Sequence, residues 1–250
     1  MIKIALDAGH GLYTQGKQTP DGIKEWTLND KVRDKVVKYL SDYEVEIINT
    51  DNDEGSTDES LSSRLKRYKD EGVDAVVSIH HNAFTGTWNS ATGVEVYVDK
   101  NPTEDDLKLA KAIYDRMVEY TPLAPRGIKR ANFTVINQNS IPAVLCEGGF
   151  MDSTSDYEYI ISDEGQDAYA KAIAEGLVEF LNLQKKKQEN IIECSFVDID
   201  GHFAEDVIAD LFKMGIVNGV DETHYMPEKG VTRGEVAIIA RNIIRYITGN

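Results

Sequence analysis

The sequence predicts an α/β protein, a three-layer α/β/α sandwich around a mixed, mostly parallel sheet, followed by a small all-α C-terminal module. Short apolar runs that are typical of strands alternate with longer helical patterns over residues 1–183. Such alternation is typical of a sheet that is covered by helices. A polar segment follows, and beyond it only helical patterns appear. We therefore predict a first domain at 1–183, a linker at 184–194 and a second module at 195–250.

Six strand-like runs and four helical patterns make up the predicted first domain. The strands are expected at Lys3–Asp7, Val45–Ile48, Ala75–Ile79, Val94–Val98, Phe133–Ile136 and Ala143–Leu145. The helices are expected where apolar residues recur every three or four positions, within 32–40, 61–68, 109–120 and 172–181. Each helix therefore has one apolar face to bury against the sheet.

The C-terminal module contains two helical patterns, at Ala204–Met214 and Thr232–Ile247, joined by a glycine-containing turn segment. A single module of about 60 residues builds only a small core. We therefore expect it to lean on the first domain or on another copy of itself, which makes a homo-oligomer one expectation.

Charge and composition exclude several classes of partner. The formal net charge of -16 disfavours nucleic acid and anionic membrane surfaces. No run of about 18 apolar residues is present, so no membrane insertion is expected. The N-terminal run meets Asp7 before an export segment develops, so we expect synthesis in the cytoplasm without a signal peptide. Cys146 and Cys194 form no CxxC pair, which disfavours a thiolate zinc site.

Metal-ligating side chains occur where the chain leaves predicted strands. His10 lies between two glycines just after the first strand, and His80 and His81 follow the third. Glu25 begins the first helical segment. Two histidines and one carboxylate leave a fourth tetrahedral position open, as in hydrolytic zinc sites. Because neighbouring strand residues point to opposite faces, only one of His80 and His81 can join His10, and the residues alone do not choose between them.

A second carboxylate stands at another strand end. Glu147 follows the apolar run 143–146 and precedes two glycines, so its side chain is expected at the same edge of the sheet. A carboxylate in that place can serve as general base.

Four motifs in order resemble one family. DAGHG at 7–11, SIHHNA at 78–83, RGIK at 126–129 and IPAVLCEGGFMD at 141–152 are similar to the amidase-3 class of zinc-dependent N-acetylmuramoyl-L-alanine amidases. The resemblance runs from residue 1 to about residue 183. It implies a peptidoglycan hydrolase that cleaves the amide bond between the lactyl group of N-acetylmuramic acid and L-alanine of the stem peptide.

The resemblance also implies roles for particular residues. One Zn2+ per catalytic domain would be held by His10, Glu25 and His80, which decides between the two histidines, and Glu147 would carry the proton. The same resemblance makes Asn82, His81 and Arg126 candidate substrate contacts, and the alternative role of Asn82 is to orient His80.

The C-terminal module resembles a single S-layer homology (SLH) repeat over about residues 195–247, through FVDI at 196–199, FAEDVI at 203–208, GIVNG at 215–219 and TRGE at 232–235. Such repeats anchor proteins to secondary cell-wall polymers, and Arg233 is the expected contact to an acidic group of the polymer. Phe203 stands where the family often has Trp, and the repeats commonly come in threes. A lone copy is therefore expected either to assemble the chain into oligomers or to bind the polymer weakly.

Two other functions compete with the amidase. One is a non-catalytic wall-binding protein, and the other is a zinc peptidase or carboxypeptidase that acts on stem peptides. If the chain is a lysin, we expect it to act at the bacterial cell wall after release, as phage endolysins and mother-cell lysins do.

Overall fold

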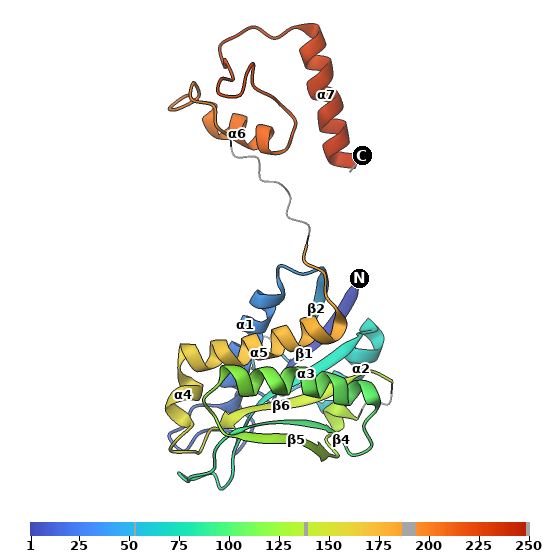
Figure 1. Ribbon diagram of the computed structural model, residues 1–250, viewed down its shortest axis with the longest axis vertical. Coiled ribbons are helices and arrows are strands. Elements are labelled where there is room, and N and C mark those ends of the chain that lie inside the picture. Colours follow the sequence, from blue (N-terminus) through green and yellow to red (C-terminus); the bar gives the residue numbers. More distant parts are fainter. Residues whose placement is uncertain (53, 138–139, 187–193, 249–250) are drawn as a thin grey trace. The chain divides into compact units, whose positions relative to one another are not determined.

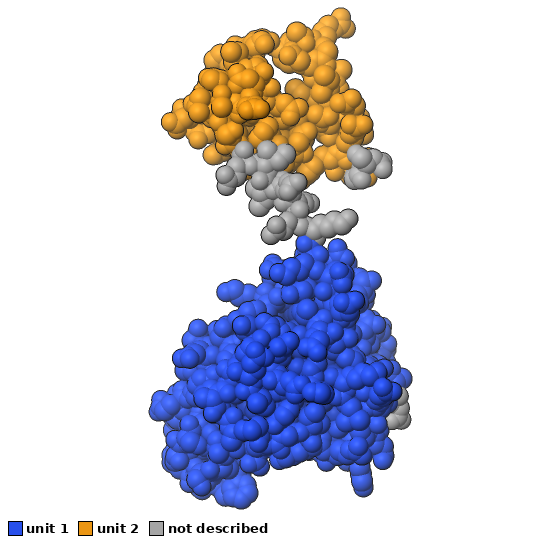
Figure 2. Space-filling model, in the orientation of Figure 1, with its two compact units in different colours: residues 1–186 blue, residues 187–250 orange. Residues whose placement is uncertain are grey.

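The computed structural model describes all residues except 53, 138–139, 187–193 and 249–250. The chain forms two compact units, residues 1–186 and 187–250 (Figure 2). Most of the predicted linker therefore lies outside the described residues. Among the residues described, no helix is both long and apolar enough to span a membrane.

A six-stranded sheet forms the centre of the first unit (Figure 1). Its strands lie in the order β2-β1-β3-β6-β4-β5. All neighbouring strands are parallel except β4 and β6, which confirms the mixed, mostly parallel sheet. The strands are β1 (Ile2–Ala8), β2 (Val45–Asn49), β3 (Ala75–Asn82), β4 (Val94–Asp99), β5 (Pro125–Ala131) and β6 (Ala143–Phe150).

Helices cover the two faces of this sheet unequally. Three long helices, α1 (Glu25–Leu40), α3 (Glu104–Tyr120) and α5 (Asp163–Leu181), pack together on one face, and α4 (Tyr157–Ile161) precedes α5 (Figure 1). The other face packs against α2 (Leu61–Glu71) and the short 3-10 helix η1 (Thr134–Ile136). Alternate residues of each strand supply the two cores: Ile4 and Leu6 belong to the first and Ala5 to the second.

Polar residues mark where the helices begin and end. The side chains of Ser60, Thr103 and Ser162 each accept a backbone N–H from the first turn of α2, α3 and α5. At the C-terminal ends, Gly72 and Asn182 adopt the left-handed conformation that closes α2 and α5. These signals, together with the apolar stripes, account for the helix positions predicted from the sequence.

The strand predicted at Phe133–Ile136 is wrong. That segment contains η1, and the missing strand is β5, which begins eight residues earlier. Val135 and Ile136 are adjacent and both buried on the same core, which a 3-10 turn permits and an alternating strand does not. β5 is an edge strand and none of its residues is buried, so its polar sequence carries little of the apolar alternation that identifies a strand.

Two strands run further than predicted, and this affects the site. β3 continues to Asn82 and β6 to Phe150, so His80, His81 and Glu147 lie within strands rather than after them. The side chains are therefore fixed by the pleat of the sheet.

The second unit has a much smaller core. Its helices are α6 (Glu205–Lys213) and α7 (Arg233–Thr248). Phe196, Ile199 and Ile208 form the buried cluster, against which Phe212 and Tyr225 pack. Within the part of this unit that is described, α7 contributes no buried residue.

Candidate metal centre

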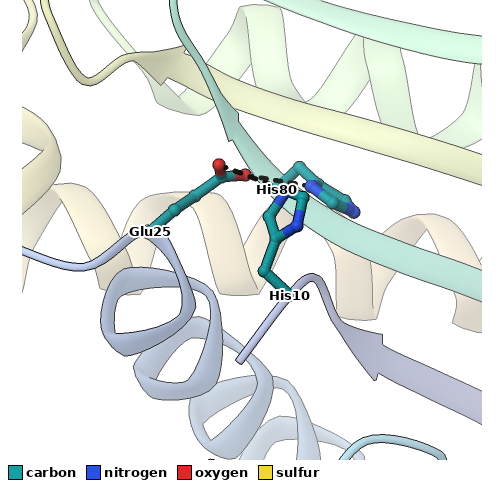
Figure 3. A group of neighbouring side chains, drawn as sticks. All are labelled: His10, Glu25 and His80. Carbon is teal, nitrogen blue, oxygen red and sulfur yellow. Dashed lines mark hydrogen bonds and ion pairs between the residues drawn. The ribbon is translucent and has the colours of Figure 1, made fainter. Parts of the chain in front are cut away.

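Three side chains that could hold a metal ion come from distant parts of the chain and converge in the first unit (Figure 3). His10 follows β1, Glu25 opens α1, and His80 lies on β3. One ligand atom from each lies within 4.8 Å of the others. Glu25 stands between the two rings, with Oε1 2.9 Å from Nδ1 of His80 and Oε2 3.3 Å from Nε2 of His10.

The backbone at His10 adopts an unusual conformation that its surroundings maintain. Its φ is 69°, in the left-handed region that non-glycine residues seldom occupy. The buried guanidinium of Arg64 donates to the carbonyl oxygens of Ala8 and His10, at 3.1 and 3.0 Å, and pairs with the buried carboxylate of Asp7. Residues of β1 and α2 thereby hold the turn that presents His10.

The glycine before His10 is required by the packing of His80. A Cβ atom at Gly9 would lie 2.0 Å from Cε1 of His80. Only a residue without a side chain lets the imidazole rest on this backbone, which gives the first glycine of the DAGHG motif a physical reason.

The first turn of α1 supplies Glu25 and, one turn later, its support. A carboxylate at a helix N-terminus is stabilised by the helix dipole. Asn29 lies on the same face of α1; its Nδ2 donates to the carbonyl of Gly9 at 3.2 Å, and its Oδ1 is 2.8 Å from Nδ1 of His81. The helix start is thus tied to both histidine-bearing segments.

The two adjacent histidines point to opposite faces of β3. His80 joins Glu25 and His10, whereas His81 is 3% exposed and packs between Asn29 and the ring of Tyr169, 5.6 Å away. The hydroxyl of Tyr169 also donates to the carbonyl of His80 at 3.3 Å. His81 therefore lies behind the cluster.

Glu147 lies beside the cluster because β6 pairs with β3. It is the register partner of His80. Among the described residues its buried Oε2 has no hydrogen-bond partner. Glu147, His10 and His80 line one cavity of about 570 Å³, whose wall includes Lys17 and Phe133.

Burial and charge set the protonation states of these groups. Burial alone would raise the pKa of Glu25, but the hydrogen bond and charge of His80, with the charge of His10, lower it to about 2. Burial lowers the pKa of His10 to about 4. Burial, with the charges of Glu25 and Glu95, raises the pKa of Glu147 to about 8. The hydrogen bond and charge of Glu25 outweigh burial and raise the pKa of His80. At neutral pH Glu25 is thus ionised and His10 neutral, which are the forms that bind metals.

The other predicted contacts lie outside this cluster. The side-chain amide of Asn82 donates to Oε1 of Glu95 at 2.7 Å. Nε of Arg126 donates to Oε2 of the same carboxylate at 2.6 Å, and its guanidinium lies 4.8 Å from the ring centroid of Phe150. In the second unit, Arg233 is an exposed residue at the start of α7.

Sequence reasoning missed four residues that support the cluster: Asn29, Arg64, Glu95 and Tyr169. Two of them carry a signal. Asn29 is four residues after Glu25, and Arg64 lies on the same helix face as the apolar Leu61 and Tyr68, where a charge indicates a buried partner. Glu95 and Tyr169 act through partners far along the chain, which spacing does not reveal.

Comparisons with known proteins agree with this geometry. The N-acetylmuramoyl-L-alanine amidase family matches residues 4–179, and the S-layer homology domain matches residues 195–237. The chain is 29% identical over 193 residues to the sporulation-specific N-acetylmuramoyl-L-alanine amidase of Bacillus subtilis, covering 76% of this chain and 72% of that protein. It is 33% identical over 191 residues to the endolysin of Bacillus phage SPP1, covering 73% and 67%.

A solved structure has the same fold as the first unit. The N-acetylmuramoyl-L-alanine amidase from Clostridium difficile 630 superposes with a TM-score of 0.68 at 30% identity, covering 72% of this chain and 97% of that one. The family match spans well over half of the chain, and the His–Glu–His cluster lies within the matched region. The chain therefore belongs to the N-acetylmuramoyl-L-alanine amidase family, whose members hydrolyse peptidoglycan, and an S-layer homology domain follows its amidase domain.

Proposed function

We propose that this amidase is zinc-dependent, with His10, Glu25 and His80 as the metal ligands and Glu147 as the residue that carries the proton. The observation that carries the proposal is the convergence of these three side chains within 4.8 Å, with Glu147 paired to His80 across the sheet. The bond cleaved would be the amide between the lactyl group of N-acetylmuramic acid and L-alanine.

The donor set fits zinc. Two imidazoles and one carboxylate are a ligand set of hydrolytic zinc sites. Within the described part of the chain, the buried Nε2 of His10 has no hydrogen-bond partner, and the nearly buried charge of Glu25 faces two imidazoles rather than a lysine or arginine. A bound zinc ion would supply the Lewis acidity that activates a water and polarises the scissile carbonyl.

Glu147 is suited to move the proton. A general acid–base group works best when its pKa is close to the working pH, and that of Glu147 is raised to about 8. Its Oε2 would accept the proton of the attacking water and return it to the nitrogen of the leaving L-alanine. Among the other candidates, Asn82 and Arg126 would contact substrate, and His81 would orient the cluster through Asn29 because its ring is buried.

The first experiment measures zinc content and activity together. Glu147→Gln should retain zinc by elemental analysis but lose activity on purified cell walls by about 100-fold or more, because the proton carrier is gone. The matched control is Glu104→Gln, at an exposed carboxylate on α3. Full activity of Glu147→Gln would contradict the proton role.

Mass analysis of the products tests the bond. An amidase releases the stem peptide with a free L-alanine amine, whereas a carboxypeptidase shortens the stem and leaves it on the sugar. Shortened stems that remain on the sugar would favour a carboxypeptidase. Absence of zinc together with absence of hydrolysis would favour a non-catalytic wall-binding protein.

The S-layer homology domain would direct the hydrolase to a secondary cell-wall polymer, with Arg233 contacting an acidic group. Support comes from its exposure at the start of α7 and from the family match. We infer that the chain acts at the cell wall after release from the cytoplasm, as an endolysin or a mother-cell lysin. Weaker retention of Arg233→Gln than of the parent chain on amidase-resistant walls would support this contact, and equal retention would not.

A second role for this domain is self-association through α7. Val236, Ile239, Ile243 and Ile247 recur at helical spacing along one side of α7, and none of them is buried. Another copy of the chain would cover this face. Light scattering should show a species larger than a monomer for the full chain and a monomer for Ile243→Glu, while Arg241→Glu on the opposite side of α7 should leave assembly unchanged. A monomeric parent chain would rule this role out.

A further inference from the structure

A second buried carboxylate lies two strands away from His80. Glu95 on β4 is 1% exposed and accepts four side-chain hydrogen bonds. The donors are Asn82 Nδ2 and Tyr97 OH, each at 2.7 Å, Arg126 Nε at 2.6 Å, and the ammonium of Lys129. Neither cation is needed by the proton transfer assigned to Glu147.

The register of the sheet places Glu95 in line with His80 of the proposed metal site. Glu147 pairs with His80 on one side and with Glu95 on the other, so these three side chains stand in a row on one face. The ladder between β4 and β5 is irregular between Val94 and Val96, where 126 and 127 together lie opposite Glu95. This bulge turns Arg126 toward the same row.

Arg126 and Lys129 together carry more positive charge than the single carboxylate of Glu95 neutralises. Glu95 carries one negative charge, and the side chains of Arg126 and Lys129 are 37% and 35% exposed. This half-exposed pair thus has an excess positive charge in a chain whose formal net charge is -16. A cation that is already ordered and partly dehydrated binds an anion with little further loss of entropy.

Arg126 is held in place on several sides. Its guanidinium lies over the Phe150 ring, its Nη1 donates to the carbonyl of Thr92 at 3.3 Å, and a Cβ at Gly93 would come within 2.8 Å of its Cγ. No hydrogen bond from its Nη2 is found within the described residues. The outer edge of the guanidinium therefore retains donor capacity.

The pair lies at the margin of the cavity that contains Glu147. The Lys129 ammonium is 5.9 Å from the ring centroid of Tyr97, and that ring is 5.1 Å from Phe133, which lines the cavity. β5 is two strand spacings from β6, which is about 10 Å. An extended peptide advances about 3.3–3.6 Å per residue, so this distance corresponds to about three residues.

We propose that Arg126 and Lys129, positioned by Glu95, bind a carboxylate that the stem peptide carries two or three residues beyond the scissile amide. The inference rests on the proposed function because it places the scissile amide at Glu147. Such a site makes the enzyme selective for stem peptides whose carboxylates are free rather than amidated.

The test compares two N-acetylmuramoyl tripeptides that differ only in whether the carboxylates of the second and third residues are free or amidated. The zinc-loaded parent chain should have a kcat/KM about tenfold higher for the acidic substrate, mainly through KM, as expected for one charged hydrogen bond. In Lys129→Met and Arg126→Gln the two substrates should become nearly equal. Lys111→Met, at an exposed lysine on α3, should keep the parent preference. Added salt should weaken the preference because the cations are half-exposed.

Equal kcat/KM values for the two substrates with the parent chain would overturn the inference. An equal loss on both substrates in Lys129→Met would also overturn it, since that pattern indicates a structural role. If the zinc-loaded parent chain hydrolyses neither substrate, the proposed function fails, and calorimetric binding of the same two compounds then decides this inference separately. Tighter binding of the acidic compound supports the carboxylate site, and equal binding refutes it.

Discussion

Glu25 and Glu95 are both buried carboxylates near Glu147, but their partners differ. Glu25 lies between two imidazoles, and burial lowers the pKa of one of them, His10, to about 4. Glu95 pairs with an arginine and a lysine, Arg126 and Lys129. The first carboxylate thus faces two imidazoles that can share a metal ion with it, whereas the second faces two cations and would favour an anion. The same residue type would thus serve two proposed sites that bind ions of opposite charge.

Between these two stands Glu147, whose Oε2 has no hydrogen-bond partner in the described part of the chain. Burial, with the neighbouring carboxylates, outweighs the charge of His80 and raises the pKa of Glu147. A carboxylate in such a place exchanges a proton near neutral pH, which neither Glu25 nor Glu95 is suited to do, because their pKa values are lowered.

The largest expected effect concerns the buried ion pair between Arg64 and Asp7, which holds the turn that presents His10 to Glu25. Arg64→Met leaves the buried Asp7 carboxylate without its cationic partner and removes the donors to the carbonyls of Ala8 and His10. We expect the free energy of unfolding to fall by about 3–5 kcal/mol, as when one member of a buried pair is removed. Urea denaturation measures it. Lys66→Met, at an exposed lysine on the same helix, is the control, and a similar small change in both variants would contradict the prediction.

A smaller effect is expected from removing the negative charge of the His–Glu–His cluster. Glu25→Gln keeps the shape of the side chain but leaves two imidazoles without an anion between them. Zinc affinity, measured by competition with a chelator, should fall by about 100-fold or more. Unchanged zinc affinity would show that Glu25 is not a metal ligand.

The smallest effect is expected for Glu95, whose contribution to the free energy of unfolding depends on pH. Hydrogen bonds from Lys129, Tyr97 and Arg126 outweigh burial and lower the pKa of Glu95. Its stabilising contribution is therefore complete above its unfolded pKa of about 4.3 and is lost as the pH falls through the folded value. Glu95→Gln should reduce the free energy of unfolding by about 1–3 kcal/mol at pH 7. Urea denaturation at pH 7 and at successively lower pH should show the difference from the parent chain shrinking, and a constant difference would contradict the assignment.

Much of the first unit follows from local patterns in the sequence. The apolar alternation and the helical stripes depend on which face of each element is buried, and they located five of the six strands and the long helices. Strand β5 was missed because none of its residues is buried, unlike Ile48 of β2 at the other edge, so its sequence lacks the apolar alternation. The adjacent Val135 and Ile136 looked like a strand because burial, not backbone conformation, determines where apolar residues occur.

The sequence by itself determined that His80 and His81 point to opposite faces, since that follows from the strand period of two, and its motifs indicated the amidase family. Only the tertiary structure decided that His80 meets Glu25 while His81 packs against Asn29, because that depends on which face of β3 receives α1. The roles of Arg64 and Glu95 also appear only in the fold. A charge is stable in the interior only beside its partners, and those partners lie on other elements of the chain.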